Sequence, residues 1–200
     1  MLIGEKVILE EIDHSNIEQL RQWRNDPTMR KFFREYKDIT KNKQEMWYNE
    51  RGNNTNPAHI YFQIMKFSSG APEIRPEYVD VGKKVLIGCC NLSYIDYRLR
   101  SAEFGIFLGS NRGSGRGKEA LVLMCDFGFK ELNLHKIWCE VFDNNESVNL
   151  YRKMGFRDEG ILRDSYYHDG SYGNSYVLSI LENEWREKYG EGSLRETKSL

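Results

Sequence analysis

The stretch that decides the fold is FLGSNRGSGRGKEALVLMCDFGF, residues 107–129, in which an apolar strand, a glycine-rich turn and an amphipathic helix follow one another. Apolar residues recur at helical intervals over residues 115–132, which predicts a helix there. The amides of a helix's first turn lack intrahelical partners and lie at the positive end of its dipole, so they can bind a phosphate or pyrophosphate. A glycine-rich turn with nearby bases also occurs as a plain connection, so the turn alone leaves both interpretations open.

Two better-known phosphate-binding motifs do not fit this turn. A dinucleotide-binding fold carries its glycine-rich turn early and an acidic residue about 20 positions later, whereas this turn lies past the midpoint of the chain. In a P-loop the lysine is followed by Ser or Thr, which holds magnesium, whereas Glu119 follows Lys118 here. Hydrolysis of a nucleoside triphosphate is therefore disfavoured.

The segments on either side predict one mixed α/β domain over residues 1–185, with a polar tail at 186–200. Strands are expected at residues 6–12, 59–67, 85–95, 102–108, 136–142, 156–165 and 175–181, and further helices at 15–25, 40–51 and 145–154, with Ser15 and Thr40 as caps. The polar turn at 96–101 favours a hairpin between its flanking strands. Residues 68–84 form an excursion between strands rather than a linker between domains.

Composition limits the classes of function. Of 200 residues, 40% are hydrophobic and 30% are charged, which suits a folded core rather than a disordered chain. No uncharged apolar stretch approaches the roughly 18 residues of a spanning helix, so no membrane role is expected. The formal charge of −1 disfavours dedicated nucleic-acid binding.

The four cysteines, Cys89, Cys90, Cys125 and Cys139, lie in apolar runs without ligand spacing. They are expected to be buried thiols, and no metal site is expected. The opening residues MLIGEKVILEE carry charges by the fifth position and lack the long apolar region of a signal peptide. A reducing cytoplasm fits both observations.

Two spaced motifs give the chain a resemblance to the GCN5-related N-acetyltransferase (GNAT) superfamily over roughly residues 1–185. Arg112, Gly115 and Gly117 match its acyl-CoA signature in order, and a second segment matches at Asn144, Ser147, Tyr151, Lys153, Gly155 and Phe156. AEFGIFL at 102–108 and DGSYGNSYVLSILENEW at 169–185 resemble the branch of ribosomal-protein N-terminal, spermidine and nucleotide-amino-sugar acetyltransferases. The excursion at 68–84 is longer than the hairpin usual in that branch.

The resemblance implies a splayed, mixed but mostly antiparallel sheet flanked by helices, with a bulge in the strand at 102–108. It implies acetyl-CoA as co-substrate and direct attack of a primary amine on the thioester. The amine would belong to a polyamine, an amino-sugar nucleotide or a protein N-terminus, and a homodimer or larger homo-oligomer is possible. The alternative is a non-catalytic acyl-CoA-binding regulatory module.

The same resemblance assigns the coenzyme contacts. The positions carried over are Ile106, Leu108, Arg112, Gly113, Ser114, Gly115, Arg116, Gly117, Lys118, Asn144 and Ser147. The stretch after Glu140 looks one residue short, so Asn144 and Asn145 compete for the family's Asn position, and helix capping explains these residues equally well.

Three residues are candidates for the chemistry. Tyr151 is expected to be the general acid that protonates the leaving thiolate, and its alternative role is packing beside Val148. Glu103 and Glu140 are candidate bases, with Glu103 favoured, and both could instead be structural carboxylates. The presence of both Tyr151 and Glu103 favours an enzyme. The acceptor pocket is expected from residues 23–36 and 166–176, whose aromatic residues could stack on an acceptor or belong to the core.

Overall fold

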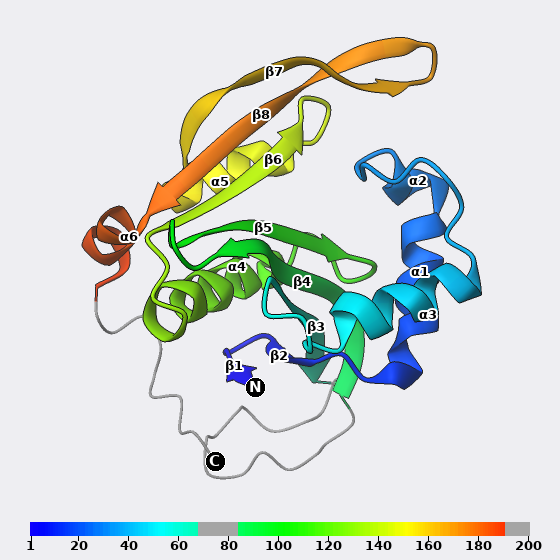
Figure 1. Ribbon diagram of the computed structural model, residues 1–200, viewed down its shortest axis with the longest axis horizontal. Coiled ribbons are helices and arrows are strands. Elements are labelled where there is room, and N and C mark those ends of the chain that lie inside the picture. Colours follow the sequence, from blue (N-terminus) through cyan, green and yellow to red (C-terminus); the bar gives the residue numbers. More distant parts are fainter. Residues whose placement is uncertain (68–83, 191–200) are drawn as a thin grey trace.

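The computed structural model describes residues 1–67 and 84–190, which form an eight-stranded sheet with helices against both faces (Figure 1). The strand order is β1-β2-β3-β4-β5-β6-β8-β7. The strands are β1 (Leu2–Ile3), β2 (Ile8–Glu11), β3 (His59–Phe67), β4 (Lys84–Asp96), β5 (Ser101–Leu108), β6 (Lys136–Phe142), β7 (Arg157–His168) and β8 (Ser171–Leu181). The helices are α1 (Ile17–Asn25), α2 (Pro27–Arg30), α3 (Lys41–Trp47), α4 (Arg116–Asp126), α5 (Ser147–Met154) and α6 (Glu182–Tyr189).

The sheet is mixed and mostly antiparallel, as predicted. Only the pair β5 and β6 runs parallel, because α4 carries the chain back across the sheet between them. The expected hairpin of β4 and β5 is present, with Gly88 opposite Leu108 and Ser93 opposite Glu103. The excursion expected at 68–84 lies outside the described residues, apart from Lys84, which opens β4 and contacts Glu10.

The prediction of a bulge in the strand at 102–108 is wrong, because the irregularity lies on the neighbouring strand. The register between β4 and β5 shifts between Ser93 and Asp96, which places the irregularity on β4. Tyr94, inside this interval, has a φ of 53°, a left-handed conformation that a regular strand cannot hold. β5 itself pairs with β4 without interruption from Glu103 to Leu108.

The sheet opens on the other side of β5. Hydrogen-bonded register with β6 covers three residues, from Ser101 opposite Lys136 to Glu103 opposite Trp138. Beyond that point β5 continues along β4 and β6 continues along β8, so the two strands diverge (Figure 1). The splayed sheet that the sequence led us to expect is thus confirmed.

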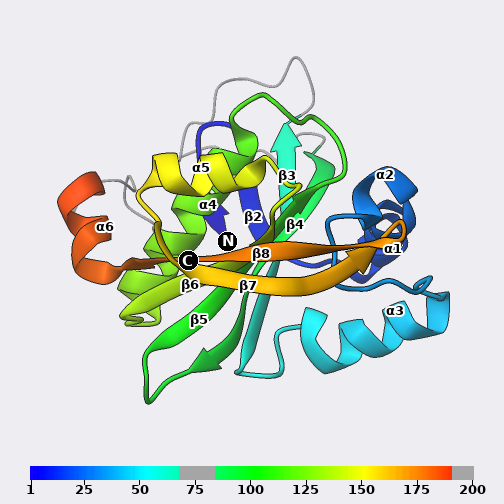
Figure 2. The same cartoon turned by 90° about the horizontal axis from the view of Figure 1, so that it is seen from above.

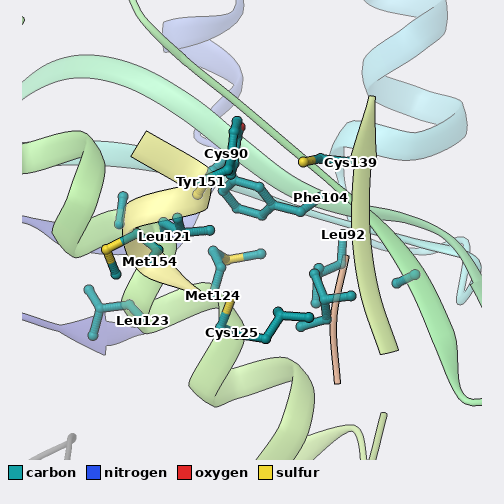
Figure 3. Close-up of a cluster of buried hydrophobic side chains, with 14 of the residues drawn as sticks. Cys90, Leu92, Phe104, Leu121, Leu123, Met124, Cys125, Cys139, Tyr151 and Met154 are labelled. Carbon is teal, nitrogen blue, oxygen red and sulfur yellow. The ribbon is translucent and has the colours of Figure 1, made fainter. Parts of the chain in front are cut away.

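Two apolar clusters cover opposite faces of the sheet. One, shown in part in Figure 3, packs residues of α4, α5 and α6 against the strands, and the other packs Ile17 and Leu20 of α1. Adjacent residues Cys90 and Cys89 of β4 belong to the first and the second cluster respectively, as strand alternation requires. All four cysteines are free and buried, as expected. In Figure 2 α4 and α5 lie on one side of the strands and α3 on the other.

Several helix limits differ from those expected. Ser15 is not the first cap, because the side chain of Asp13 accepts a hydrogen bond from the Ser15 amide and opens a 3-10 turn at His14–Asn16 before α1. Thr40 caps α3 as predicted. The helices expected at 40–51 and 115–132 each end in a π-helical turn, Tyr48–Gly52 and Phe127–Glu131.

The C-terminal helix continues past the boundary expected at residue 185. The indole of Trp185 donates a hydrogen bond of 2.6 Å to the buried carboxylate of Asp126, and the ring of Tyr189 lies 4.0 Å from that of Trp185. The hydrogen bond to Asp126 docks α6 on α4, and the expected tail therefore begins as a helix. Within the described residues, no helix is long and apolar enough to cross a membrane.

Glu119 fixes the start of α4 relative to the N-terminal strands. Its carboxylate accepts hydrogen bonds from the amides of Glu5, Lys6 and Val7 at 2.9, 2.7 and 2.8 Å. Glu119, which stands where a P-loop would have Ser or Thr, therefore has a structural function. It anchors the start of α4 to the segment between β1 and β2.

Candidate active site

A cavity of about 850 Å³ opens where β5 and β6 diverge. Its walls come from both strands, the first turns of α4 and α5, and the segment from α1 to α3. Its volume lies in the range of small-molecule and cofactor sites. All six β5 residues from Glu103 to Leu108, including Ile106, line it.

The glycine-rich turn presents bare backbone to this cavity. Gly113 and Gly115 have φ values of 77° and 79°, which favour glycine. Gly115 is the N-cap of α4 and no side chain caps the helix there. Gly115, Gly117 and Lys118 all line the cavity, so the first-turn amides of α4 and a lysine face the same space. This arrangement fits a pyrophosphate, and the adjoining edge of β5 fits an extended arm.

The structure brings most of the predicted residues to the cavity. Those lining it are Glu103, Ile106, Leu108, Arg112, Gly113, Gly115, Gly117, Lys118, Glu140, Ser147 and Tyr151. Ser114 and Arg116 are not among its lining residues. The Ser114 hydroxyl accepts a hydrogen bond from Arg116 and donates one to the Asn111 carbonyl, so both side chains tie the turn together.

The two asparagines differ in position. Asn145 lines the cavity and its side chain accepts a hydrogen bond from the Ser147 amide at 3.0 Å. Asn144 is not a lining residue, so the geometry favours Asn145 for a direct contact. Arg112 also has a defined place, because its Nε donates to the Leu108 carbonyl and holds the turn against the end of β5.

Tyr151 combines burial with access to the cavity. Its side chain is 5% exposed, and its ring packs edge-on against Phe104 and Phe156 (Figure 3). Burial, reinforced by the nearby Cys139 and Cys125 thiols, raises the pKa of the phenol well above its ordinary value. No hydrogen bond of its hydroxyl occurs within the described part of the chain. Tyr151 thus packs in the core cluster that also contains Val148, and its role as a proton donor remains a prediction.

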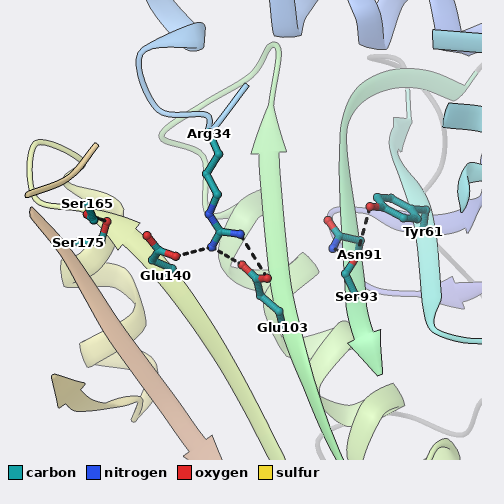
Figure 4. A network of polar contacts seen from close by, with 8 residues as sticks. All are labelled: Arg34, Tyr61, Asn91, Ser93, Glu103, Glu140, Ser165 and Ser175. Atoms are coloured by element: carbon teal, nitrogen blue, oxygen red, sulfur yellow. Dashed lines mark hydrogen bonds and ion pairs between the residues drawn. The ribbon is translucent and has the colours of Figure 1, made fainter. Parts of the chain in front are cut away.

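Both candidate bases are held by one cation that the sequence did not indicate. Arg34, in the segment after α2, bonds Glu103 at 2.6 Å and Glu140 at 2.7 Å, and so bridges the two diverging strands (Figure 4). The carboxylate side chains are only 12% and 16% exposed, whereas the Arg34 side chain is 51% exposed, so solvent reaches these ion pairs from the arginine side. Burial opposes the charge on Arg34, but the hydrogen bond to Glu103 and the charges of both carboxylates raise its pKa.

A second polar group lies on the β4 side of the cavity. Asn91 donates a hydrogen bond to the Ser93 hydroxyl, which donates to Tyr61 at 3.2 Å (Figure 4). All three residues line the cavity. Asn91 and Ser93 lie two residues apart on β4 and so share one face of the strand, whereas Tyr61 joins them only through the pairing of β3 with β4, which the sequence did not indicate.

Of the two segments expected to form the acceptor pocket, only residues 23–36 contribute to the cavity. Residues from α1 to α3, such as Phe32 and Phe33, line it, as predicted for 23–36. Residues 166–176 do not, because the β7–β8 hairpin carries them away from the opening (Figure 1). Tyr167 and Tyr172 are 63% and 67% exposed there, and Tyr166 stacks on Phe142 at 4.1 Å.

The described residues contain no group of three or more His, Cys, Asp or Glu side chains arranged to hold a metal ion. Independence from metals remains a prediction, based on the chemistry of acyl transfer to an amine. That chemistry needs a positioned thioester, a base and an acid.

Fold and site together define a class of protein, an α/β protein whose sheet opens between two diverging strands into a cavity lined by a glycine-rich helix turn. Residues 6–157 match the family model described as an acetyltransferase (GNAT) domain. The chain belongs to this family, and the resemblance seen in the sequence is confirmed.

Named relatives are N-acetyltransferases. The chain is 36% identical over 102 residues to an uncharacterized N-acetyltransferase of Bacillus licheniformis, covering 50% of this chain and 57% of the relative. It is 35% identical over 109 residues to the spermidine N(1)-acetyltransferase of Vibrio cholerae, covering 54% and 63%. The chain thus aligns with a little over half the length of these curated relatives.

Solved structures agree in fold. The Vibrio cholerae spermidine N-acetyltransferase in complex with CoA and spermine superposes with a TM-score of 0.77 at 24% identity, covering 91% of this chain and 99% of that one. A dodecameric structure of the Vibrio cholerae enzyme gives a TM-score of 0.73 at 24% identity, with coverages of 92% and 99%.

We predict that Gly117→Val weakens acetyl-CoA binding while the fold persists. A Cβ at Gly117 would lie 3.5 Å from Leu108 Cδ1, an ordinary contact, so valine can be accommodated but projects where a pyrophosphate would approach the amides. Because charge-assisted hydrogen bonds contribute about 1.5–3 kcal/mol each, loss of one predicts a fall in affinity of about tenfold to a hundredfold by calorimetry.

Gly160→Val is the matched control. Gly160 lies on β7, nothing lies within 4 Å of an added Cβ, and the residue does not line the cavity. The Gly160→Val protein should therefore bind acetyl-CoA with the same affinity as the parent. Unchanged affinity in folded Gly117→Val would place the pyrophosphate elsewhere.

Proposed function

We propose that the protein transfers the acetyl group of acetyl-CoA to a primary amine by direct attack of the amine on the thioester. The observation that carries this proposal is the opening between β5 and β6. It gathers an uncapped helix turn, a buried phenol and two carboxylates around one cavity. Together these groups supply what the reaction needs: a hold on the donor, an acid and a base.

Direct attack is supported by the state of the cysteines. Cys89 is a cavity-lining thiol, and burial raises its pKa to about 12, so it holds its proton at neutral pH and is a poor nucleophile. Burial also raises the pKa values of Cys90, Cys125 and Cys139. The amine itself is therefore the nucleophile in this proposal, and no acetyl-enzyme forms.

Tyr151 is the proposed general acid. As the amine attacks, the carbon–sulfur bond breaks and the CoA thiolate takes the phenol proton. Burial raises the pKa of the phenol, so the group remains protonated at neutral pH. The packing of its ring by Phe104 and Phe156 fixes the direction of the hydroxyl.

Glu103 is the proposed base, acting directly or through water on the proton of the attacking amine. It is the last β5 residue paired with β6, so it stands at the point where the strands separate. Arg34 holds its carboxylate in place beside that of Glu140, which remains the second candidate.

The remaining proposals concern the coenzyme contacts and the cell. Ile106, Leu108, the turn at 112–118, Asn144 or Asn145, and Ser147 are proposed to contact the coenzyme. A cytoplasmic location is supported by the four buried free thiols. A homo-oligomer is supported by apolar side chains exposed on the β7–β8 hairpin, among them Ile161 at 58%.

The test of function is release of free CoA thiol from acetyl-CoA in the presence of a panel of amines. The panel should hold polyamines, amino-sugar nucleotides, amino acids and N-terminal peptides, and mass spectrometry should find the acetyl group on the amine. We expect turnover with at least one class. Tight binding of acetyl-CoA without turnover of any amine would instead identify a non-catalytic acyl-CoA-binding module.

Replacement of Tyr151 by Phe keeps the ring and removes the proton. Because general acid catalysis contributes about a hundredfold to ten-thousandfold, kcat should fall within that range while affinity for acetyl-CoA changes little. In the parent, kcat with saturating amine should show no alkaline fall from this group below pH 10, the ordinary pKa of tyrosine, because the pKa of Tyr151 is raised.

Tyr189→Phe provides the comparison. This variant removes a partly buried hydroxyl that donates a hydrogen bond to the Met154 carbonyl outside the cavity. It should lower the stability of the fold and leave kcat unchanged. If Tyr151→Phe turned over as fast as the parent with saturating acceptor, the phenol would be assigned to packing alone.

A further inference from the structure

We infer that Arg24 and Gln44 form a subsite for an anionic group on the amine acceptor. The acceptor would then carry a carboxylate or a phosphate in addition to its amine. This inference rests on the proposed acetyl transfer and specifies the chemical class of its acceptor.

Arg24 is a cation placed in the cavity wall without a carboxylate partner. It lies in the last turn of α1 and lines the cavity, and its guanidinium carbon lies 5.5 Å from the centre of the Phe33 ring. Within the described residues it forms no ion pair and no hydrogen bond. Burial lowers its pKa, which is the mark of a charge whose solvation has not been replaced.

The contrast with Arg21, one turn earlier on the same helix, shows that pairing is available to arginines of α1. Arg21 bonds both carboxylate oxygens of Glu18 and the Ile39 carbonyl. Glu35 is the carboxylate that acts on Arg24, and it does so only weakly and without contact. An anion from outside the chain would supply the missing partner, and an arginine fork suits a carboxylate or phosphate.

Gln44 is an independent sign of a ligand. It lies on α3, is 2% exposed and lines the same cavity, yet its Oε1 has no hydrogen-bond partner in the described part of the chain. A buried amide without a partner is costly, so a group of the bound ligand is expected to complete it. Rotation of the terminal amide presents either the oxygen or the NH2 group to that ligand.

Two consecutive residues, Phe33 and Arg34, contact the two parts of the cavity: Phe33 contacts the arginine of the subsite, and Arg34 contacts the carboxylate pair. Phe33 faces Arg24 and packs on Phe107, while Arg34 turns to Glu103 and Glu140. Arg24, Glu103 and Glu140 line the same cavity, so in this proposal the acceptor places its amine near the carboxylates and its anionic group near Arg24. A polyamine lacks such a group and would bring a second cation to an unpaired arginine.

The test uses pairs of amines of matched length, one of each pair carrying the anion. Suitable pairs are 4-aminobutyrate with butylamine, glycylglycine with its amide, and phosphoethanolamine with ethanolamine. Binding is measured by calorimetry on the full chain with CoA present, and kcat/KM is measured with acetyl-CoA. We expect the anionic member to bind more tightly, by about tenfold to a hundredfold, given the strength of hydrogen bonds to charged groups.

Arg24→Gln should abolish this preference by weakening the anionic member alone, chiefly through KM, and Arg24→Lys should retain part of it. Arg163→Gln, which removes an exposed cation of β7 outside the cavity, should leave the preference intact. A neutral or polycationic amine preferred by the parent, no anionic member bound, or a preference that survives Arg24→Gln would overturn the inference. Because binding is read without turnover, a failure of acetyl transfer would show separately.

Discussion

The early end of pairing between β5 and β6 is the constraint on which the rest of the structure depends. The two strands share register only up to Glu103 and Trp138. Each then keeps its backbone hydrogen bonds with its other neighbour: β5 with β4 up to Leu108, and β6 with β8 along its whole length. The sheet can therefore open without losing its order, and the freed edge of β5 becomes the wall of a cavity.

Ion pairs of one arginine join the two strands across the opening. Arg34 reaches from the segment after α2 to a carboxylate on each side of the gap, and so connects the N-terminal helices to the diverging strands. On the other side, Tyr151 comes from α5 and is held by packing in the apolar core, including edge-on contacts with two aromatic rings. Acid and base thus have different environments, one apolar and one ion-paired, and burial in the apolar one raises the pKa of the phenol.

Local patterns predicted the strands, the glycine-rich turn and the Thr40 cap. The family resemblance, rather than any local pattern, implied the convergence of Tyr151, Glu103 and Glu140 on one site. The sequence could not indicate Arg34, because its ion pairs join residues 69 and 106 positions apart. The sequence did not indicate Arg24 and Gln44 for a related reason: no residue pattern shows that a side chain lacks an ion-pair or hydrogen-bond partner in the fold. The π-helical turns and the bulge at Tyr94 have no residue pattern in the sequence that distinguishes them from a regular helix or strand.

Direct attack within the opened sheet is tested most directly by incubating the protein with acetyl-CoA alone and measuring its intact mass. The mass should remain that of the unmodified chain, and initial rates with both substrates should give intersecting reciprocal plots, as a ternary complex requires. A chain that gains one acetyl group and passes it to an amine added later, with parallel reciprocal plots, would contradict direct attack.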